Sequence, residues 1–428
     1  MDTELKTLRE ALGHRRSIDL FAGCGGLSLG LHQSGWEGLF AIERDPMAFE
    51  TLFSNLAADG APYSAFRKWP SWLPTEAMSV EQLLEPHHRA ELEAMRGEVA
   101  LVAGGPPCQG FSVGGRRNGA DSRNVLVHHL LDVVDVLQPP FVLIENVEGI
   151  ARRFVSKPGA SPQSTADNVV AELDAMGYVA TYTVVDASKF GVPQARRRVL
   201  IFGVKRALLR DGQEISLGKA LEEVRLDHLR DLGLPLERAV TASEAIGDLD
   251  GPKRVVCPDS PKFMSGTYKP ARSSFARLMR RKIPTSSTPD SHRFSVHGDG
   301  ILHMYQLALA TQPPGRLSKA FMVSCGTKKE KKYVVDPGSP ASTITTHPDE
   351  FIHFREPRNI TVREMARFQS FPDDFHFKGR YTINGPRRRF DVARCSQVGN
   401  AVPPLLAAAV GRAMDRIASQ LADSDQGG

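Results

Sequence analysis

A short apolar run followed by a glycine-rich turn, within residues 17–35, restricts the possible folds of this chain most strongly. Residues 17–21 (SIDLF) have the composition of a buried strand, and the next stretch, AGCGGLSLGLHQSG, supplies glycines for a turn and leucines for a helix. Gly23, Gly25 and Gly26 allow the backbone conformations that a tight turn needs. A strand, a glycine-rich turn and a helix form the nucleotide-binding unit of an open α/β sheet, so we expect that fold class.

Further apolar runs predict more strands, and residues 179–185 and the end of residues 190–203 are also predicted to be extended. Residues 39–42 form one such run, and Glu43 follows it at the position where an acidic side chain holds ribose hydroxyls in these sheets. A solvated charge at the end of a strand is the alternative for Glu43. Residues 99–102 and 141–144 predict two more buried strands, with an amphipathic helix over residues 124–137 between them.

A single cysteine lies in a stiff loop directly after one of these strands. The stretch AGGPPCQGFSV, residues 103–113, places two glycines and two prolines immediately before Cys108. Each proline fixes φ, so the loop holds the thiol in one position. A buried structural cysteine in a tight turn is the alternative, but the surrounding motifs favour a nucleophile.

The other cysteines and the overall composition narrow the class of protein. The five cysteines are scattered and form no CxxC pair, which argues against a disulfide framework and against a zinc site, so we expect no metal. Apolar residues make up 41% of the chain and charged residues 24%, as in ordinary globular proteins. No run of about 18 apolar residues and no apolar signal core occur, so we expect a cytoplasmic protein without a membrane span.

Charge is distributed unevenly along the chain. Residues 251–335 contain 16 basic and four acidic residues, a net charge of +12, whereas the rest of the chain carries −7. A strongly basic region on an acidic body indicates a polyanionic partner. A solvated basic face without a partner is the alternative.

The alternation of strands and helices suggests three segments. It fades after Lys205 and returns with Thr361 and Glu364, which have the spacing of a helix capping box. We therefore predict a catalytic and cofactor-binding domain over residues 1–204 and a smaller, loop-rich target-recognition domain over 205–355. Residues 356–428 are predicted to hold a hinge helix and a final helix that packs back on the first domain.

Taken together, the motifs of this chain resemble those of the bacterial DNA (cytosine-5) methyltransferase family. They occur in the family's usual order and cover residues 17–204 and 360–420. The matching stretches are DLFAGCGGLSLG, the strand ending at Glu43, GGPPCQGFS, ENV, QARRR, TVREMARFQSFPDDF and QVGNAVPP. The family's acidic third motif has no clear counterpart between residues 57 and 98.

The resemblance implies a Rossmann-like, doubly wound methyltransferase sheet and a specific catalytic set. It implies that Cys108 adds to C6 of a flipped-out cytosine and so activates C5 for methylation. It implies that Glu145 contacts N3 and the exocyclic amine, and that Arg198 donates to O2. Arg196, which alternates with Arg198 about Arg197 on one face if this stretch is extended, would support the pocket.

The resemblance also implies a cofactor and a partner. The cofactor is S-adenosyl-L-methionine, held by Phe21, Gly23, Gly25, Gly26, Glu43, Pro106, Asn400 and Val402. The partner is double-stranded DNA, and the basic residues predicted to contact it, with one serine, are Ser112, Arg116, Arg117, Arg123, Arg280, Arg281, Lys328 and Lys329. A cognate restriction endonuclease is a candidate second partner, and we expect a monomer.

Three other functions compete with DNA methylation. A tRNA cytosine-5 methyltransferase could use the same scaffold, although about 150 residues of variable middle sequence favour a DNA reader. A non-catalytic DNA-binding regulator is disfavoured by the intact Cys108, Glu145, Arg196 and Arg198. An NAD-dependent oxidoreductase would account for the glycine turn but leaves PPCQ, ENV and QVGNAVPP unexplained.

Overall fold

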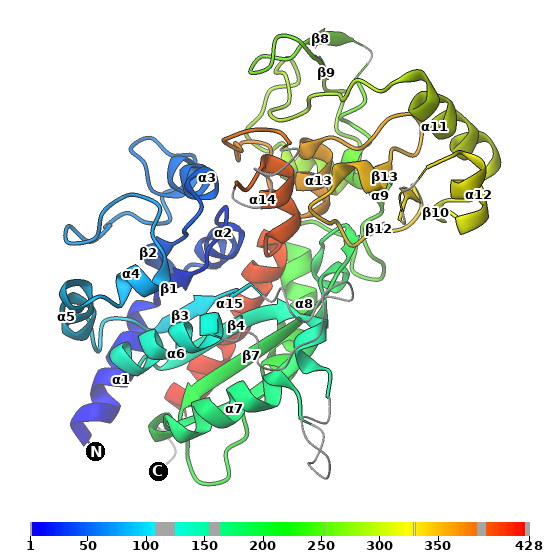
Figure 1. Cartoon of the computed structure of the whole chain (residues 1–428). Coiled ribbons are helices and arrows are strands. Elements are labelled where there is room, and N and C mark those ends of the chain that lie inside the picture. The colour runs from blue at the N-terminus through cyan, green and yellow to red at the C-terminus, as the bar shows by residue number, and fades with distance from the viewer. Residues whose placement is uncertain are drawn as a thin grey trace. The chain divides into compact units, whose positions relative to one another are not determined.

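A six-stranded mixed sheet forms the centre of the first part of the chain in the computed structural model (Figure 1). Its strands lie in the order β2-β1-β3-β4-β7-β5. All neighbouring pairs are parallel except those made by β7, which runs antiparallel to both β4 and β5. The strands are β1 (Arg16–Leu20), β2 (Glu37–Ile42), β3 (Leu101–Gly104), β4 (Phe141–Val147), β5 (Tyr178–Asp186) and β7 (Arg197–Lys205). The predicted α/β class and Rossmann-like sheet are confirmed.

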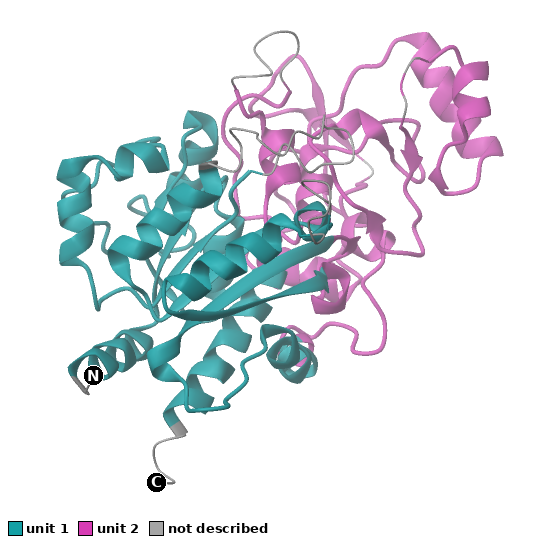
Figure 2. Cartoon of the chain, turned by 60° about the horizontal axis from the view of Figure 1, so that its bottom comes forward, with its two compact units in different colours: residues 1–186, 197–228, 406–428 teal, residues 187–196, 229–405 magenta. Residues whose placement is uncertain are grey.

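The structure describes residues 2–107, 125–153, 163–251, 253–327, 329, 331–382 and 391–423. The chain divides into two compact units (Figure 2). Unit 1 comprises residues 1–186, 197–228 and 406–428, and unit 2 comprises residues 187–196 and 229–405.

Helices cover both faces of the sheet in unit 1. Apolar side chains of α6 and α7 pack in one core with strand residues such as Ile18, Val102 and Ile144, all fully buried. In Figure 1, α6 and α7 lie in front of the sheet and α15 lies behind it. The helices of this unit are α1 (Asp2–His14), α2 (Gly26–Gln33), α3 (Pro46–Leu56), α4 (Val80–Leu83), α5 (Pro86–Ala94), α6 (Val125–Leu137), α7 (Thr165–Ala175), η1 (Glu148–Ala151) and η3 (Arg206–Leu208).

The last helix of the chain lies mostly in unit 1. Helix α15 (Pro404–Asp423) begins in unit 2, and its residues from 406 onward belong to unit 1. Trp36 Nε1 donates to the carbonyl of Gly411 at 3.4 Å. A β-carbon at position 411 would lie 1.9 Å from Ser34 Oγ and 2.9 Å from Ser34 Cβ, so glycine at this position allows α15 to approach Ser34 closely.

Unit 2 consists of short elements joined by long loops. Its small sheets are β10-β11-β13, β12-β6 and β8-β9. The predicted capping box of α13 is confirmed, since Thr361 Oγ1 accepts from Glu364 N while the Glu364 carboxylate accepts from Thr361 N. The elements are η2 (Ala187–Phe190), β6 (Gln194–Ala195), α9 (Ala242–Ile246), β8 (Arg254–Val256), β9 (Met264–Gly266), α10 (Ser274–Met279), α11 (Asp299–Thr311), β10 (Gly315–Arg316), α12 (Lys319–Ser324), β11 (Tyr333–Val334), β12 (Ala341–Ser342), η4 (Pro348–Glu350), β13 (Phe351–Ile352), α13 (Val362–Phe368) and α14 (Arg394–Asn400), while α8 (Leu217–Asp231) crosses between the units.

The boundaries of the compact units differ from those predicted at residues 204 and 355. Residues 205–228 pack with unit 1 rather than with the middle segment, and residues 187–196 pack with unit 2. Residues 187–196 join unit 2 because β6, which lies within them, pairs in parallel with β12 near residue 341. Assignment of target recognition to residues 205–355 stays a prediction.

Candidate active site

The glycine-rich turn between β1 and α2 has the conformation that its sequence predicts. Phe21, Gly23 and Gly25 all have positive φ, at 57°, 58° and 91°. A β-carbon on Gly25 would lie 2.6 Å from Leu56 Cδ1, whereas one on Gly23 would meet nothing within 4 Å. Gly25 thus permits close packing against α3, and Gly23 leaves open space beside the turn. Phe21 is a non-glycine residue in the left-handed region, a conformation common at binding sites.

Glu43 ties this turn to the end of β2. Its Oε2 accepts from Gly23 N at 2.9 Å, and its Oε1 accepts from Asp45 N at 2.7 Å. Burial raises the pKa of Glu43, although both hydrogen bonds favour the carboxylate. Each oxygen keeps a lone pair, so the carboxylate can still accept hydrogen bonds from two ligand hydroxyls.

A buried acid lies beneath the turn and was not singled out from the sequence. Asp19 in β1 is 3% exposed, and its Oδ2 accepts a hydrogen bond from Ser28 Oγ in α2. Its Oδ1 has no hydrogen-bond partner among the described residues. Burial raises the pKa of Asp19 to about 7, and the nearby Glu43 adds to this effect. The only sequence signal is an acid inside an otherwise apolar strand.

Strand β3 leads toward the predicted nucleophile. A β-carbon on Gly104 would lie 2.6 Å from the carbonyl oxygen of Leu20, so this glycine allows β3 to end against β1. Asn146 Nδ2 donates to the carbonyl of Pro106 at 3.0 Å and fixes the segment that precedes residue 108. Cys108 itself lies outside the described residues, as do Ser112, Arg116, Arg117 and Arg123.

Glu145 and Arg198 meet at this end of the sheet. The carboxylate Oε1 and the guanidinium Nε are 2.9 Å apart, and both side chains are only 10% exposed. They come from β4 and the antiparallel β7, where Glu145 lies opposite Leu200 and Arg198 lies opposite Val147. Burial lowers the pKa of Arg198, while the attraction of Glu145 opposes the shift. The pair therefore sets a hydrogen-bond acceptor and a donor side by side at the carboxyl ends of β3 and β4.

Arg196 has a different environment from the one expected. The extended run is interrupted at this residue, since β6 ends at Ala195 and β7 begins at Arg197. Arg196 belongs to unit 2 and is 3% exposed. Its guanidinium donates to three backbone carbonyls, those of Ile344, Gly399 and Ala401.

Asn400 and Val402 also belong to unit 2. Asn400 is the last residue of α14 and is exposed, and Val402 lies half-buried between α14 and α15. Both side chains are therefore accessible to a ligand, as their predicted role requires.

The predicted DNA contacts separate into two kinds. Arg281 and Lys329 are exposed, with Lys329 paired to Asp349, and Lys328 lies outside the described residues. Arg280 is instead buried, with its Nη1 3.0 Å from Asp248 Oδ2, and also donates to Lys269 O. Its position argues against the predicted contact with DNA, because neighbouring groups already occupy a guanidinium that solvent does not reach.

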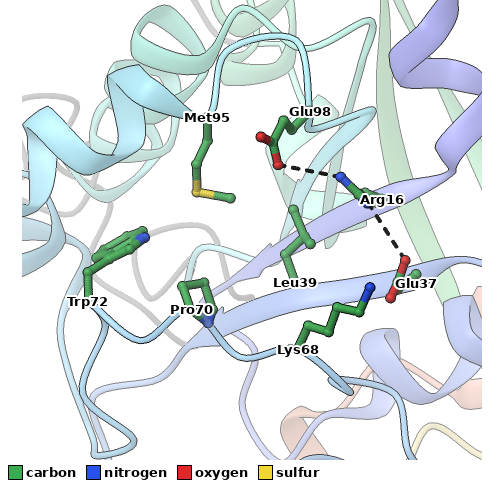
Figure 3. Close-up of a pocket in the computed structure, with 8 residues that line it drawn as sticks. All are labelled: Arg16, Glu37, Leu39, Lys68, Pro70, Trp72, Met95 and Glu98. Carbon is green, nitrogen blue, oxygen red and sulfur yellow. Dashed lines mark hydrogen bonds and ion pairs between the residues drawn. The ribbon is translucent and has the colours of Figure 1, made fainter.

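A surface pocket of about 250 Å³ lies elsewhere in unit 1 (Figure 3). It lies at the amino-terminal ends of β1 and β2, with Arg16 paired to Glu37 and Glu98 at its rim and Trp72 in its lining. Ligands of open α/β sheets bind at the carboxyl ends of the strands, so this pocket is not the active site. Among the residues that the structure describes, no cluster suited to holding a metal ion occurs. None of the described helices is long and apolar enough to cross a membrane.

Comparisons with known proteins agree with this geometry. The family model for C-5 cytosine-specific DNA methylases matches residues 15–416. The type II methyltransferase M.AgeI of Thalassovita gelatinovora is 30% identical over 93% of this chain and 98% of that protein. M.DdeI of Desulfomicrobium norvegicum is 29% identical over 92% and 86%, respectively.

Solved structures give the same result. A prophage-encoded protein of E. coli, described as a DNA modification methyltransferase, superposes with a TM-score of 0.63 at 26% identity, over 94% of this chain and 99% of that one. The S. pombe Dnmt2 methyltransferase shares the fold alone, with a TM-score of 0.51 at 16% identity over 96% and 99%. The chain therefore belongs to the C-5 cytosine-specific DNA methylase family and is a DNA (cytosine-5) methyltransferase.

Proposed function

We propose that this enzyme methylates C5 of a flipped-out cytosine within a specific sequence of duplex DNA, with Cys108 as the nucleophile and S-adenosylmethionine as the cofactor. The observation that carries the proposal is the buried pair of Glu145 and Arg198, 2.9 Å apart beside the strand that leads to Cys108. A β-carbon on Gly105 would lie 3.4 Å from Glu145 Oε2, so the carboxylate adjoins the backbone just before the nucleophile.

The chemistry requires these side chains. C5 of cytosine is a weak nucleophile, so the Cys108 thiolate adds to C6 and converts the ring to an enamine. Glu145 accepts a hydrogen bond from the exocyclic amine and stabilises a proton at N3, while Arg198 donates to O2. After methyl transfer, loss of the C5 proton and departure of the Cys108 thiolate restore the aromatic ring.

The residues near the first turn fit the proposed cofactor. S-adenosylmethionine would supply the electrophilic methyl group. Gly23 leaves open space at the turn, and the two Glu43 oxygens are fixed by backbone N–H groups while keeping lone pairs for ribose hydroxyls. Asn400 and Val402 in unit 2 are the remaining candidate contacts.

The proposal extends to the substrate and partners. The relatives M.AgeI and M.DdeI are type II methyltransferases, which supports a sequence-specific DNA substrate and a cognate restriction endonuclease. The exposed basic residues of the 251–335 stretch, such as Arg281 and Lys329, would supply phosphate contacts, which give affinity without choice of sequence. We expect the enzyme to act as a monomer.

The decisive experiment replaces the nucleophile. Cys108→Ser should abolish methyl transfer to duplex DNA while leaving S-adenosylmethionine affinity within a few-fold of wild type, because a serine hydroxyl is a poor nucleophile at neutral pH. Covalent trapping on DNA that contains 5-fluorocytosine should also disappear. Cys325→Ser, which changes a half-buried cysteine of unit 2, is the matched control and should still trap DNA. An adduct formed by Cys108→Ser, or transfer to tRNA in preference to DNA, would contradict the proposal.

A further inference from the structure

Helix α14 ends at a turn whose carbonyl groups need donors from outside the helix. The last carbonyls of any helix have no partner within it. Here the helix ends at Asn400 and the next one begins at Pro404, a proline that cannot donate through its nitrogen. The intervening backbone, which we call the 398–402 turn (residues 398–402), carries the accessible side chains of Asn400 and Val402.

Two buried side chains from distant parts of the sequence supply those donors. Arg196 Nη2 donates to Gly399 O at 3.0 Å and to Ala401 O at 3.2 Å. Gln369 Nε2 donates to Val398 O at 2.7 Å and also to Ala401 O at 3.1 Å. The carbonyl of Ala401 is therefore held by both side chains.

A third side chain and a close backbone contact brace these donors. Gln194 Nε2 donates to Gln369 Oε1 at 2.8 Å, and Gln194 Oε1 accepts from Ile344 N at 2.7 Å. The turn itself lies against backbone, since a β-carbon on Gly399 would be 2.5 Å from Thr345 O. The turn is thus fixed by hydrogen bonds and by close packing together.

We propose that Arg196 and Gln369 are positioning residues that hold the 398–402 turn in the conformation in which Asn400 and Val402 bind the cofactor, and that Arg196 does not contact the cytosine. This inference rests on the proposed function, because it assigns the turn to S-adenosylmethionine. Arg196 is 3% exposed, and both of its terminal nitrogens already donate to backbone carbonyls of unit 2. It could reach a substrate only by leaving buried carbonyls without a donor, which is costly.

The test compares substitutions at the two donors with a matched control. Gln397 is also a buried glutamine of unit 2, and its Nε2 likewise donates to two backbone carbonyls, those of Lys378 and Val392, away from the turn. Gln369→Leu and Gln397→Leu therefore each remove two hydrogen bonds to backbone carbonyls, and Gln369→Leu also removes the acceptor of Gln194 Nε2. Arg196→Lys keeps the charge but loses the planar fork that bridges two carbonyls, and Arg196→Met loses both.

Three measurements separate the outcomes. By calorimetry, S-adenosylmethionine should bind about tenfold or more weakly to Gln369→Leu and Arg196→Met, with a smaller loss for Arg196→Lys and little change for Gln397→Leu. Amide hydrogen exchange in a peptide spanning the 398–402 turn should accelerate in Gln369→Leu, Arg196→Met and Arg196→Lys, and stay at the wild-type rate in Gln397→Leu. At saturating cofactor, covalent trapping on 5-fluorocytosine DNA should stay near the wild-type level.

Other results would overturn the inference. Unchanged cofactor affinity with abolished trapping in Arg196→Lys would assign Arg196 to the cytosine instead. Equal losses of S-adenosylmethionine affinity in Gln369→Leu and Gln397→Leu would show that the loss comes from general destabilisation and not from the 398–402 turn. A DNA methylation assay of the wild-type enzyme, run in parallel, tests the proposed function separately. If wild type does not methylate DNA, the hydrogen-exchange comparison between the variants can still be interpreted.

Discussion

Asp19 should make the stability of unit 1 depend on pH in a way that one substitution removes. Its carboxyl is buried beneath the glycine-rich turn between β1 and α2, with one oxygen bonded to Ser28 and the other without a partner in the described structure. The carboxylate of Glu43 lies near enough to disfavour a second negative charge. Burial and the nearby Glu43 carboxylate both make the ionised form of Asp19 unfavourable in the folded state. Asp19 therefore keeps its proton to higher pH in the folded chain than in the unfolded chain.

The size of the effect follows from the pKa values. The Asp19 pKa is raised from its ordinary 3.8 to about 7, and each tenfold difference in proton affinity corresponds to about 1.4 kcal/mol. Ionisation of Asp19 should therefore cost the folded state about 4 kcal/mol in total. The unfolded chain releases this proton near pH 4 and the folded chain near pH 7, so stability should fall as the pH rises through that window.

Equilibrium unfolding in urea at about pH 5 and about pH 8 tests this reasoning. All three tryptophans, Trp36, Trp69 and Trp72, belong to unit 1, so their fluorescence follows the unfolding of that unit. From about pH 5 to about pH 8, the free energy of unfolding should fall by about 2–3 kcal/mol more for wild type than for Asp19→Asn, whose side chain cannot ionise. Asp59→Asn, which changes an exposed aspartate of the same unit, should track wild type. Parallel pH dependences for wild type and Asp19→Asn would refute the reasoning.

Three further predictions concern cofactor binding, DNA binding and the stability of unit 2. Glu43→Ala should weaken S-adenosylmethionine binding by about 1–3 kcal/mol, the range for removing a charged hydrogen-bond partner, and calorimetry showing unchanged affinity would exclude Glu43 from the site. Replacing the exposed Arg281 and Lys331 with alanine should weaken binding to all duplex DNA alike and flatten the log–log salt dependence by about 0.9 for each phosphate that the variant no longer neutralises. Arg280→Ala should instead lower the free energy of unfolding, because it leaves the buried Asp248 with one partner fewer. A reduced salt slope at unchanged stability in Arg280→Ala would contradict this assignment.

The sequence predicted most of the sheet, and it singled out Glu145 and Arg198, which the structure brings together, because the relevant signals are local. Short apolar runs such as residues 99–102 and 141–144 identify strands, and Thr361 with Glu364 identifies the start of α13 within four residues. Contacts between distant segments carry no such signal. The three carbonyls that Arg196 contacts lie 148, 203 and 205 residues away in sequence, so nothing near the QARRR motif distinguishes its partners from the carboxylate that Arg198 contacts, although both arginines are buried. The neighbours Arg280 and Arg281 differ in exposure, one buried and one exposed, and nothing in the local sequence marks that difference either.

The basic region shows how folding changes a charge count. The +12 of residues 251–335 was counted along the chain, but folding brings acids from both flanks against this region. At least five of its 16 basic residues pair, within the described part of the chain, with acids outside it: Arg254–Glu356, Lys269–Asp250, Arg280–Asp248, Lys282–Asp374 and Lys329–Asp349.

These ion pairs limit which basic side chains are free to contact DNA phosphates. An exposed pair such as Lys329 with Asp349 contributes little to stability, so the lysine can exchange its carboxylate for a phosphate at small cost. A buried cation cannot make that exchange. Arg280 is held by Asp248, and Lys332, whose pKa burial lowers to about 8, is held by Tyr305 and the Asp349 carbonyl. The net positive charge of residues 251–335 is therefore offset more in the folded chain than the count along the sequence suggests, and we expect any phosphate contacts of this region to come from its exposed cations.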